Sequence, residues 1–205
     1  MFPTEKHASV ESYATDYFDN LQKAYQTIDF KKLGEAAALL VDCYRRGGKV
    51  FTCGNGGSAA ISNHFVCDHM KGIRAETCLK PRVVSLSSNI ETITAIANDS
   101  SYDDIFIHQL SSLAQDGDVL LTISSSGDSP NIVNAIEWAK ENQVKVIAIS
   151  GFSGGRSRKI SDVSLHVDAD NYGIVEDSHQ SLMHILAQFI RQSEMADEKI
   201  EKTKF

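Results

Sequence analysis

The sequence predicts an α/β protein, a doubly wound three-layer sandwich in which a parallel sheet lies between two layers of helices. Apolar runs of strand length alternate along the chain with segments of helical period, an order typical of such a sheet. The run at 119–123 lacks the alternation of a half-buried strand, as expected for a strand buried on both faces. Turns rich in glycine or serine follow two of the strands, at 54–58 and 124–129.

Two helices are predicted before the sheet. Apolar and aromatic residues share one helical face in the first: Val10, Tyr13, Tyr17, Leu21 and Tyr25. A second helical pattern covers 33–44. The aromatic face could cover the protein's own core or pack against another subunit, and the sequence leaves both open. We expect one domain over 1–205, with a helical extension at 1–46 and an α/β core at 47–205.

The core predicts strands and helices in alternation. Five strands are expected at 49–53, 82–86, 119–123, 144–149 and 163–167. Helices are expected at 59–70, 90–97 and 105–113. A further helix is expected after the serine-rich turn, and a long closing helix at 174–201. This spacing between strands is that of helical crossover connections.

Composition excludes several classes of function. The formal net charge of −7, without a basic run, argues against a nucleic-acid surface. We expect no membrane span and no signal peptide, and therefore a cytoplasmic protein. Cysteine spacing gives no paired metal motif, so reduced core thiols are expected at Cys43, Cys53 and Cys67.

The serine-rich stretch 124–129 is a candidate phosphate site. It joins a buried strand to a helix, with Asp128 or Ser129 as the N-cap and Pro130 at the first helical position. Backbone N–H groups and the positive end of the helix dipole attract an anion there, and serine hydroxyls add donors. An ordinary surface turn is the competing interpretation, because Asp128 is itself an anion in the proposed anion site.

A second loop, CGNGGSA at 53–59, joins a strand to a helix, and its glycines let a ligand approach the backbone closely. Its spacing differs from the dinucleotide-binding fingerprint, and no acid ends the second strand to hold a ribose. A nicotinamide cofactor is therefore not expected. Two such loops at neighbouring strand ends would bracket the crevice in which doubly wound sheets bind ligands.

A third loop, Gly151–Gly155, matches the G-x-S-x-G pattern of a nucleophile elbow and follows a predicted strand. The residues at 156–159 show no strong apolar period for the helix that an elbow requires. A flexible glycine-rich loop is the favoured interpretation, with a hydrolase as an alternative.

Ionisable residues lie on two of the predicted helices. His64 and Asp68 are four residues apart and share a face, and the closing helix carries Glu176 and His184. His184 interrupts an apolar run, so its imidazole must be paired or used. A surface pair and an acid at a helix N-terminus are the structural alternatives. Glu176 and His184 lie about 12 Å apart along a helix, too far to share a small ion directly unless the helix starts late or another subunit contributes one of them.

With these residues assembled, the chain resembles the sugar isomerase (SIS) domain family, and within it the phosphoheptose isomerases. The resemblance covers nearly the whole chain and rests on GGKVFTCGNGGSA, His64-Phe65, Ala97-Asn98-Asp99, ISSSGDSPN, SGFSGG and the spaced Glu176 and His184. It implies a five-stranded flavodoxin-like sandwich and a tetramer with sites between subunits. It also implies interconversion of sedoheptulose 7-phosphate with a heptose 7-phosphate.

The resemblance further implies the residues of the site. Those that would hold the phosphate are Ser124, Ser125, Ser126 and Ser129. Those that would contact the sugar are Asn55, Gly56, Gly57, Ser58, Asn98 and Asp99. The catalytic and zinc site would consist of His64, Asp68, Glu176 and His184. Our hypothesis has Asp68 or Glu176 as base and His184 as its acid/base partner, with zinc as a possible cofactor that polarises the carbonyl.

This chain departs from the family pattern at three points. The family's glutamate at position 68 is the shorter Asp68, and its glutamine at 176 is Glu176. One extra residue before Gly72 shifts the following arginine to Arg74. The alternative function is a non-catalytic phosphosugar-binding or adaptor protein. Such relatives typically lose both the acid and the last histidine, whereas this chain keeps an acid and His184.

Overall fold

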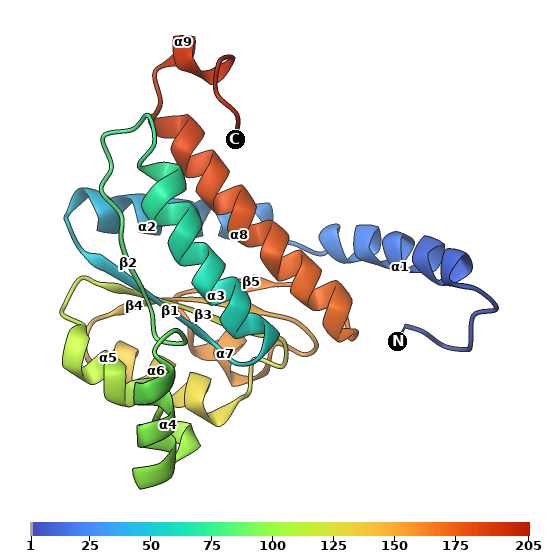
Figure 1. Cartoon of the computed structure of the whole chain (residues 1–205), viewed down its shortest axis with the longest axis horizontal. Coiled ribbons are helices and arrows are strands. Elements are labelled where there is room, and N and C mark those ends of the chain that lie inside the picture. The colour runs from blue at the N-terminus through green and yellow to red at the C-terminus, as the bar shows by residue number, and fades with distance from the viewer. Residues whose placement is uncertain (1) are drawn as a thin grey trace.

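The computed structural model describes residues 2–205 and places a five-stranded sheet at the centre of the chain (Figure 1). The strands are β1 (Lys49–Gly54), β2 (Arg82–Ser85), β3 (Val119–Ser124), β4 (Lys145–Ser150) and β5 (Val163–His166). All neighbours pair in parallel, in the order β2-β1-β3-β4-β5. The predicted parallel α/β sandwich with the flavodoxin-like strand order is confirmed.

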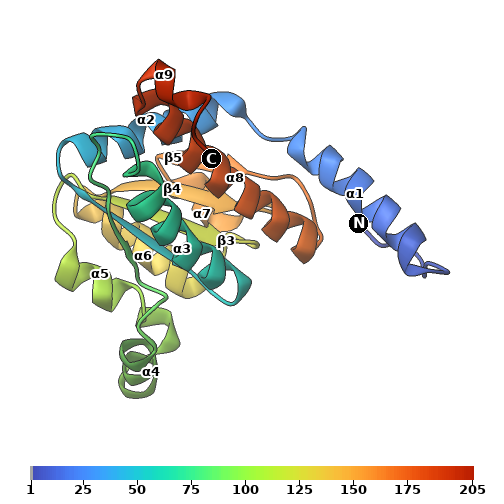
Figure 2. The same ribbon diagram turned by 45° about the horizontal axis from the view of Figure 1, so that its top comes forward.

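Helices cover both faces of this sheet (Figure 2). One face carries α2 (Phe30–Arg45), α3 (Gly57–Cys67) and α8 (Tyr172–Glu194). The other carries α4 (Ile90–Asp99), α5 (Ile107–Leu113), α6 (Pro130–Glu141) and α7 (Gly155–Ile160). A 3₁₀ turn, η2 (Tyr102–Asp104), precedes α5, and α9 (Asp197–Ile200) follows α8. Within residues 2–205, none of the helices combines the length and apolar character that crossing a membrane requires.

Each face of the sheet has its own apolar core, because consecutive strand residues point to opposite faces. In β3, Val119 and Leu121 pack towards α2, α3 and α8, whereas Leu120 packs towards α4, α5 and α6. Every residue of β3 is buried, as its unalternating sequence predicted. Since β1 and β3 are parallel neighbours, the loops that follow them leave the sheet side by side.

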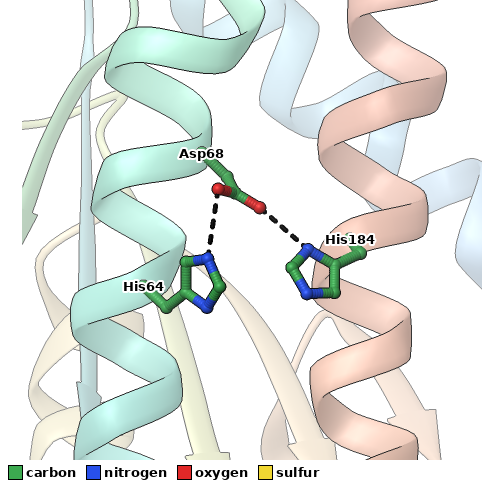
Figure 3. A group of neighbouring side chains, drawn as sticks. All are labelled: His64, Asp68 and His184. Atoms are coloured by element: carbon green, nitrogen blue, oxygen red, sulfur yellow. Dashed lines mark hydrogen bonds and ion pairs between the residues drawn. The ribbon is translucent and has the colours of Figure 1, made fainter. Parts of the chain in front are cut away.

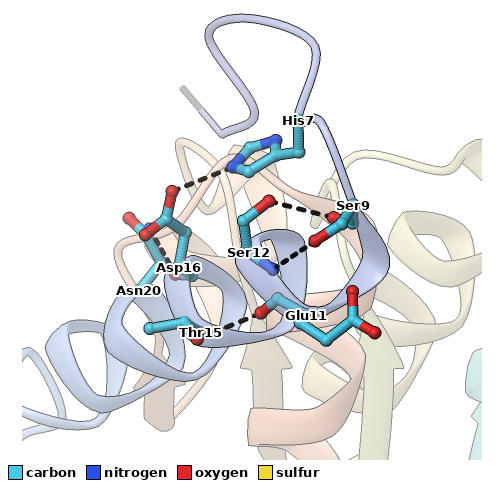
Figure 4. Close-up of polar contacts among 7 residues, drawn as sticks. All are labelled: His7, Ser9, Glu11, Ser12, Thr15, Asp16 and Asn20. Carbon is cyan, nitrogen blue, oxygen red and sulfur yellow. Dashed lines mark hydrogen bonds and ion pairs between the residues drawn. The ribbon is translucent and has the colours of Figure 1, made fainter.

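The first helix, α1 (Val10–Tyr25), begins after Ser9, whose hydroxyl oxygen accepts a hydrogen bond from Ser12 N at 3.3 Å (Figure 4). Ahead of it, His7 Nε2 lies 2.9 Å from Asp16 Oδ2, so the N-terminal segment folds back over the first turns of the helix. An N-cap of this kind stabilises a helix by about 1 kcal/mol, so the start of α1 is defined by its own sequence.

The C-terminal half of the predicted face of α1, Tyr17, Leu21 and Tyr25, packs on the protein's own core, whereas Val10 at its start is 74% exposed. Tyr17 donates to Asp177 Oδ2 at 2.7 Å, and the hydroxyl of Tyr25 lies 2.9 Å from Ser181 Oγ, both on α8. A different side chain of α1, Phe18, is 65% exposed. Val10 and Phe18 are thus the apolar side chains that α1 leaves exposed.

Three local expectations were wrong. The segment after the glycine-rich loop forms a short helix, α7, because Ile160 packs into the core beneath α6. The closing helix ends at Glu194 rather than near Glu201, since Met195 adopts an extended conformation before the short α9. Cys67, expected in the core, is exposed at the end of α3, while Cys43 and Cys53 are buried free thiols as predicted.

A π-helical segment, η1 (Asp68–Ile73), continues α3. In a π-helix the N–H group bonds five residues back instead of four, so the segment accommodates one additional residue without ending the helix. The extra residue before Gly72, noted in the sequence, lies within this segment. Because Asp68 is its first residue, the change of helix type occurs at a predicted site residue, and η1 packs against α8.

Candidate functional site

The loops that follow β1 and β3 enclose a cavity of about 280 Å³ with the start of α8. The residues that line it are Asn55, Gly56, Gly57, Ser58, Ser124, Ser125, Ser126, Ser129, Tyr172 and Glu176. Except for Tyr172, each of them was singled out from the sequence. The crevice expected between neighbouring strand ends is thus present in the fold.

The serine loop offers several hydrogen-bond donors to this cavity. Ser129 is the N-cap of α6 and a proline is its first residue, but the Ser129 hydroxyl makes no capping bond. Ser124 Oγ accepts from Gly127 N and Ser126 Oγ accepts from Asp128 N, each at 3.2 Å. Both hydroxyls therefore keep their own hydrogen free to donate. At the start of α6, Pro130 has no N–H and those of Ile132 and Val133 donate to Ser129 O, so the serine hydroxyls are the main donors to an anion here.

The carboxylate of Asp128 is paired with an arginine instead of standing unpaired in the anion site. Arg156 Nε donates to Asp128 Oδ1 at 2.6 Å, and the backbone N–H of Arg156 donates to the same oxygen at 3.2 Å. These hydrogen bonds lower the pKa of Asp128. Asp128 does not line the cavity. The main argument from the sequence against phosphate binding at this loop is therefore removed.

The glycine-rich loop at 151–155 supports the serine loop. Gly151 N donates to Ser125 O at 3.0 Å, and Ser157 N donates to Gly127 O at 2.9 Å. A Cβ atom on Gly127 would lie 2.1 Å from Gly154 O, so the two loops touch backbone to backbone. Both glycines of the G-x-S-x-G match are explained by close packing, because a Cβ on Gly155 would lie 2.5 Å from Gly127 C and one on Gly151 would lie 2.4 Å from Val175 Cγ1.

Ser153, the nucleophile that the hydrolase alternative requires, is exposed. Among residues 2–205 it makes no hydrogen bond to a histidine, so the nucleophile–base pair of a hydrolase is not formed there. The hydrolase alternative has no support from the geometry.

Gly127→Ala is expected to lower the free energy of unfolding by about 1–3 kcal/mol, the usual cost of overpacking. The new methyl group would meet the Gly154 carbonyl, and the backbone φ of Gly127 is +64°, which disfavours other residues. Thermal unfolding followed by circular dichroism measures the effect. The control is Gly72→Ala, whose Cβ would meet no atom within 4 Å. An unchanged midpoint for Gly127→Ala would contradict the close contact between the loops.

The loop after β1 brings the backbone of Gly57 close to the carboxylate of Glu176. Gly56 has a φ of +53°, and a Cβ atom on Gly57 would lie 2.6 Å from Glu176 Oε2. Glu176 thus rests on the first turn of α3, where the helix dipole attracts a negative charge. The side-chain amides of Asn55 and Asn131 exchange two hydrogen bonds of 3.0 Å, which fix the entry to this loop.

A cluster of two imidazoles and a carboxylate lies further along the α3–α8 pair (Figure 3). His184 Nδ1 lies 2.9 Å from Asp68 Oδ2, and His64 Nε2 lies 3.3 Å from Asp68 Oδ1. The two imidazole centroids are 5.0 Å apart. One ligand atom from each of the three residues lies within 4.8 Å of the others, which suits a single metal ion. The aspartate, although shorter than glutamate, reaches both histidines from the first residue of η1.

Glu176 stays outside this cluster. Within residues 2–205, the group of side chains that could hold a metal ion consists of His64, Asp68 and His184. Glu176 is not one of them. It lies about two helical turns from His184 on α8 and points into the serine-lined cavity instead. The four-residue set implied by the resemblance is therefore split between the cluster and the cavity.

Two further predicted residues also lie apart from the cavity. Asn98 donates to Asp99 Oδ1 at 2.8 Å at the end of α4, and neither side chain lines the cavity. Conversely, Tyr172 lines it although no sequence pattern indicated this residue. Gln180 was also missed, and it contacts both clustered imidazoles. Its spacing of four residues from His184 was the available signal, because that spacing puts both on one helical face.

Two other histidines near these helices are structural. His69 stacks on Phe65 at 3.7 Å and its Nδ1 lies 2.6 Å from the Tyr44 hydroxyl. Burial lowers the pKa of His69 to about 3 and that of His179 to about 4. Both rings are therefore neutral at pH 7 and fully buried, which separates them from the half-exposed cluster.

Comparison with known proteins connects this geometry to one family. Residues 13–151 match the family described as SIS domain. A probable phosphoheptose isomerase from Thermoplasma volcanium is 35% identical over 176 residues, covering 86% of this chain and 89% of that protein. A phosphoheptose isomerase from Colwellia psychrerythraea is 39% identical over 158 residues, covering 76% of this chain and 80% of its own.

Solved structures agree with these sequence relatives. The structure of a phosphoheptose isomerase from Neisseria gonorrhoeae superimposes with a TM-score of 0.82 at 32% identity, covering 90% of this chain and 100% of that one. One from Francisella tularensis gives a TM-score of 0.80 at 32% identity, covering 89% of this chain and 96% of its own.

Proposed function

The chain belongs to the SIS domain family, and from this membership we propose that it is a phosphoheptose isomerase. It interconverts sedoheptulose 7-phosphate and a heptose 7-phosphate, an aldose–ketose isomerisation. The relatives that carry this name cover most of the chain, and so does the similar structure from Neisseria gonorrhoeae.

One observation carries the proposal beyond the family. The serine-lined cavity and the His64–Asp68–His184 cluster lie on the same pair of helices, separated by about two turns. An extended sugar phosphate with its phosphate at the serine loop has its far end directed along α3 and α8. The anion site and the ionisable cluster thus suit the two ends of one substrate.

Isomerisation needs one group to remove a proton beside the carbonyl and another to protonate or polarise the carbonyl oxygen. Asp68 and His184 are 2.9 Å apart, so they can act on adjacent atoms of the sugar. We therefore assign Asp68 as the base and His184 as its acid/base partner. Glu176, which lines the cavity, is placed to accept hydrogen bonds from sugar hydroxyls between the phosphate and the reacting carbons.

A zinc ion fits the cluster. Two imidazoles and one carboxylate are ligands that zinc uses in catalytic sites, where three protein ligands leave a position open. His64, Asp68 and His184 would hold the ion, and when bound it would polarise the sugar carbonyl. Glu176 does not belong to this ligand set within one chain.

The remaining substrate contacts follow the cavity. Ser124, Ser125, Ser126 and Ser129 would bind the phosphate. The sugar would contact the residues of the loop after β1, namely Asn55, Gly56, Gly57 and Ser58. Asn98 and Asp99 would reach the sugar only from another subunit or after movement of α4, because they lie outside this cavity.

The protein is proposed to assemble as a homotetramer. Phe30, Ile185 and Phe189 are 72%, 47% and 54% exposed and border an apolar groove between α2 and α8. On α1, Phe18 is 65% exposed. Exposed apolar surface of this kind is typical of an interface between subunits. Site residues from two chains would then meet at the subunit junctions, as the resemblance implies.

Light scattering at micromolar protein is expected to give four times the mass of one chain. Phe189→Glu should lower that mass, because a carboxylate would be buried in the apolar groove without a partner. The control is Leu113→Glu, an exposed apolar position at the end of α5 on the opposite layer. A monomeric mass for the unmodified protein would contradict the assembly.

The alternative is a non-catalytic phosphosugar-binding or adaptor protein. A panel of ketose and aldose phosphates, followed by NMR, tests the choice. We expect equilibration of the seven-carbon pair, with slower or no conversion of shorter phosphosugars and none of unphosphorylated sugar. Binding without conversion of any phosphosugar would favour the adaptor. The cytoplasmic location remains a prediction.

A further inference from the structure

Gln180 completes a closed network around the ionisable cluster. It lies on α8, one turn before His184, and is half-buried. Its amide nitrogen is 2.9 Å from His184 Nε2 and 3.2 Å from His64 Nδ1. Asp68 faces the other nitrogen of each ring, at 2.9 Å for His184 and 3.3 Å for His64. The two imidazoles are thus held between a carboxylate on one side and an amide on the other.

Counting donors and acceptors assigns the ring protons. An ionised carboxylate only accepts, so Nδ1 of His184, which is hydrogen-bonded to Asp68, carries the proton. The NH₂ group of Gln180 has two hydrogens, one for each ring, so it donates to His184 Nε2 and to His64 Nδ1. In this arrangement His64 is protonated at Nε2 and His184 at Nδ1. His184 has one donor and one acceptor engaged, whereas His64 is hydrogen-bonded to Gln180 and lies at ion-pair distance from Asp68.

We propose that Gln180 is a positioning residue that sets the tautomer of His64 and the orientation of both His64 and His184. This inference rests on the proposed function, and it assigns a role to a residue that contacts the imidazoles rather than the substrate. The hydrogen bond to His64 also joins α3 to α8 across the cluster. On α8, the Gln180 side chain contacts the imidazoles of both His64 and His184, whereas the Glu176 side chain lines the cavity.

Glutamine suits this role chemically. A ring nitrogen that binds a metal must be unprotonated, so the proton sits on the other nitrogen and needs an acceptor. A residue that supplies this acceptor orients the histidine ligand. An amide offers both an N–H donor and a carbonyl acceptor, so rotation of its plane satisfies either tautomer. Methionine has a similar shape and length but offers neither a comparable donor nor a strong acceptor.

The test compares Gln180→Met with Gln192→Met. Gln192 is exposed and lies about two turns beyond His184 on α8, so it receives the same chemical change away from the cluster. Three quantities are measured: the imidazole tautomers of the metal-free protein by ¹⁵N NMR, the zinc affinity by competition with a chelating dye, and kcat and KM for the phosphosugar. For the unmodified protein we expect His64 in the Nε2–H form and His184 in the Nδ1–H form.

In Gln180→Met, His64 should populate a mixture of tautomers, whereas His184 should keep its Nδ1–H form, because Asp68 still accepts a hydrogen bond from it. Zinc affinity and kcat should each fall by about 10–100-fold, the range found for outer partners of histidine ligands, with KM little changed. Gln192→Met should leave all three quantities at the level of the unmodified protein. If Gln180→Met does not fold, Gln180→Leu removes the same hydrogen bonds with a compact apolar side chain.

Unaltered tautomers together with unaltered zinc affinity in Gln180→Met would overturn the role of Gln180. These two readouts do not depend on turnover, so they decide the inference even if the unmodified protein isomerises no phosphosugar. An active unmodified enzyme with an unaffected Gln180→Met would overturn this inference alone and leave the proposed function in place.

Discussion

Asp68→Asn is expected to lower kcat by about 10²–10⁴-fold, the usual contribution of a group that transfers a proton, with KM for the phosphosugar little changed. Its Oδ2 atom lies 2.9 Å from His184 Nδ1, and its Oδ1 atom lies 3.3 Å from His64 Nε2. An amide at this position loses the charge and the basicity while keeping the shape. The phosphate contacts lie about two turns away and should remain intact.

Steady-state kinetics of this variant gives kcat and KM, and calorimetry gives its affinity for the phosphosugar, so the loss of rate is measured separately from binding. His184→Gln should behave alike, because the acid and the base act in one proton-transfer sequence. The matched control is Asp42→Asn, which removes a surface ion pair with Arg46 and should change stability by at most about 1 kcal/mol and the rate not at all. Turnover of Asp68→Asn at the unmodified level would remove Asp68 from the mechanism and leave Glu176 as the remaining base.

Ser124→Ala combined with Ser126→Ala is expected to weaken phosphosugar binding by roughly 3–6 kcal/mol, at about 1.5–3 kcal/mol for each hydrogen bond to a charged group. Both hydroxyls line the cavity, and each retains a hydrogen for donation while its oxygen accepts a backbone N–H. Part of the loss would come from the loop itself, since those backbone bonds also disappear.

Calorimetry with phosphorylated and unphosphorylated sugar distinguishes the two contributions. Affinity for the unphosphorylated sugar should change little, because it makes no contact with the phosphate donors. Ser153→Ala is the control, an exposed serine in the supporting loop whose loss should alter neither affinity. Equal phosphosugar affinity in the double variant and the unmodified protein would exclude the serine loop as the phosphate site.

The parallel sheet was predictable because its physical signal is local. Val119–Ile123 is apolar at consecutive positions, and only a strand covered on both faces buries such a run. The glycines and serines that follow β1 and β3 then marked the ligand edge, since parallel neighbours end on the same side. The cavity lined by Asn55, Ser124 and their neighbours follows from these two facts alone.

The contacts that could not be predicted depend on how helices and loops are oriented relative to one another in the fold. Helix spacing indicated that Glu176 and His184 do not converge, but not that Glu176 rests on Gly57. The pairing of Asp128 with Arg156 joins two loops that only the fold brings together. Likewise, the contact between Asp68 and His184 joins the end of α3 to α8, two helices that only the fold brings together.

Incorporation of deuterium tests the central claim most directly. Sedoheptulose 7-phosphate is incubated with the unmodified protein in deuterium oxide and followed by NMR. Because isomerisation removes and returns a proton on the carbon beside the carbonyl, we predict exchange at C1 of the ketose together with appearance of the aldose phosphate. Tight binding of the ketose phosphate with neither exchange nor aldose, in protein loaded with zinc, would contradict an isomerase and indicate a phosphosugar-binding protein.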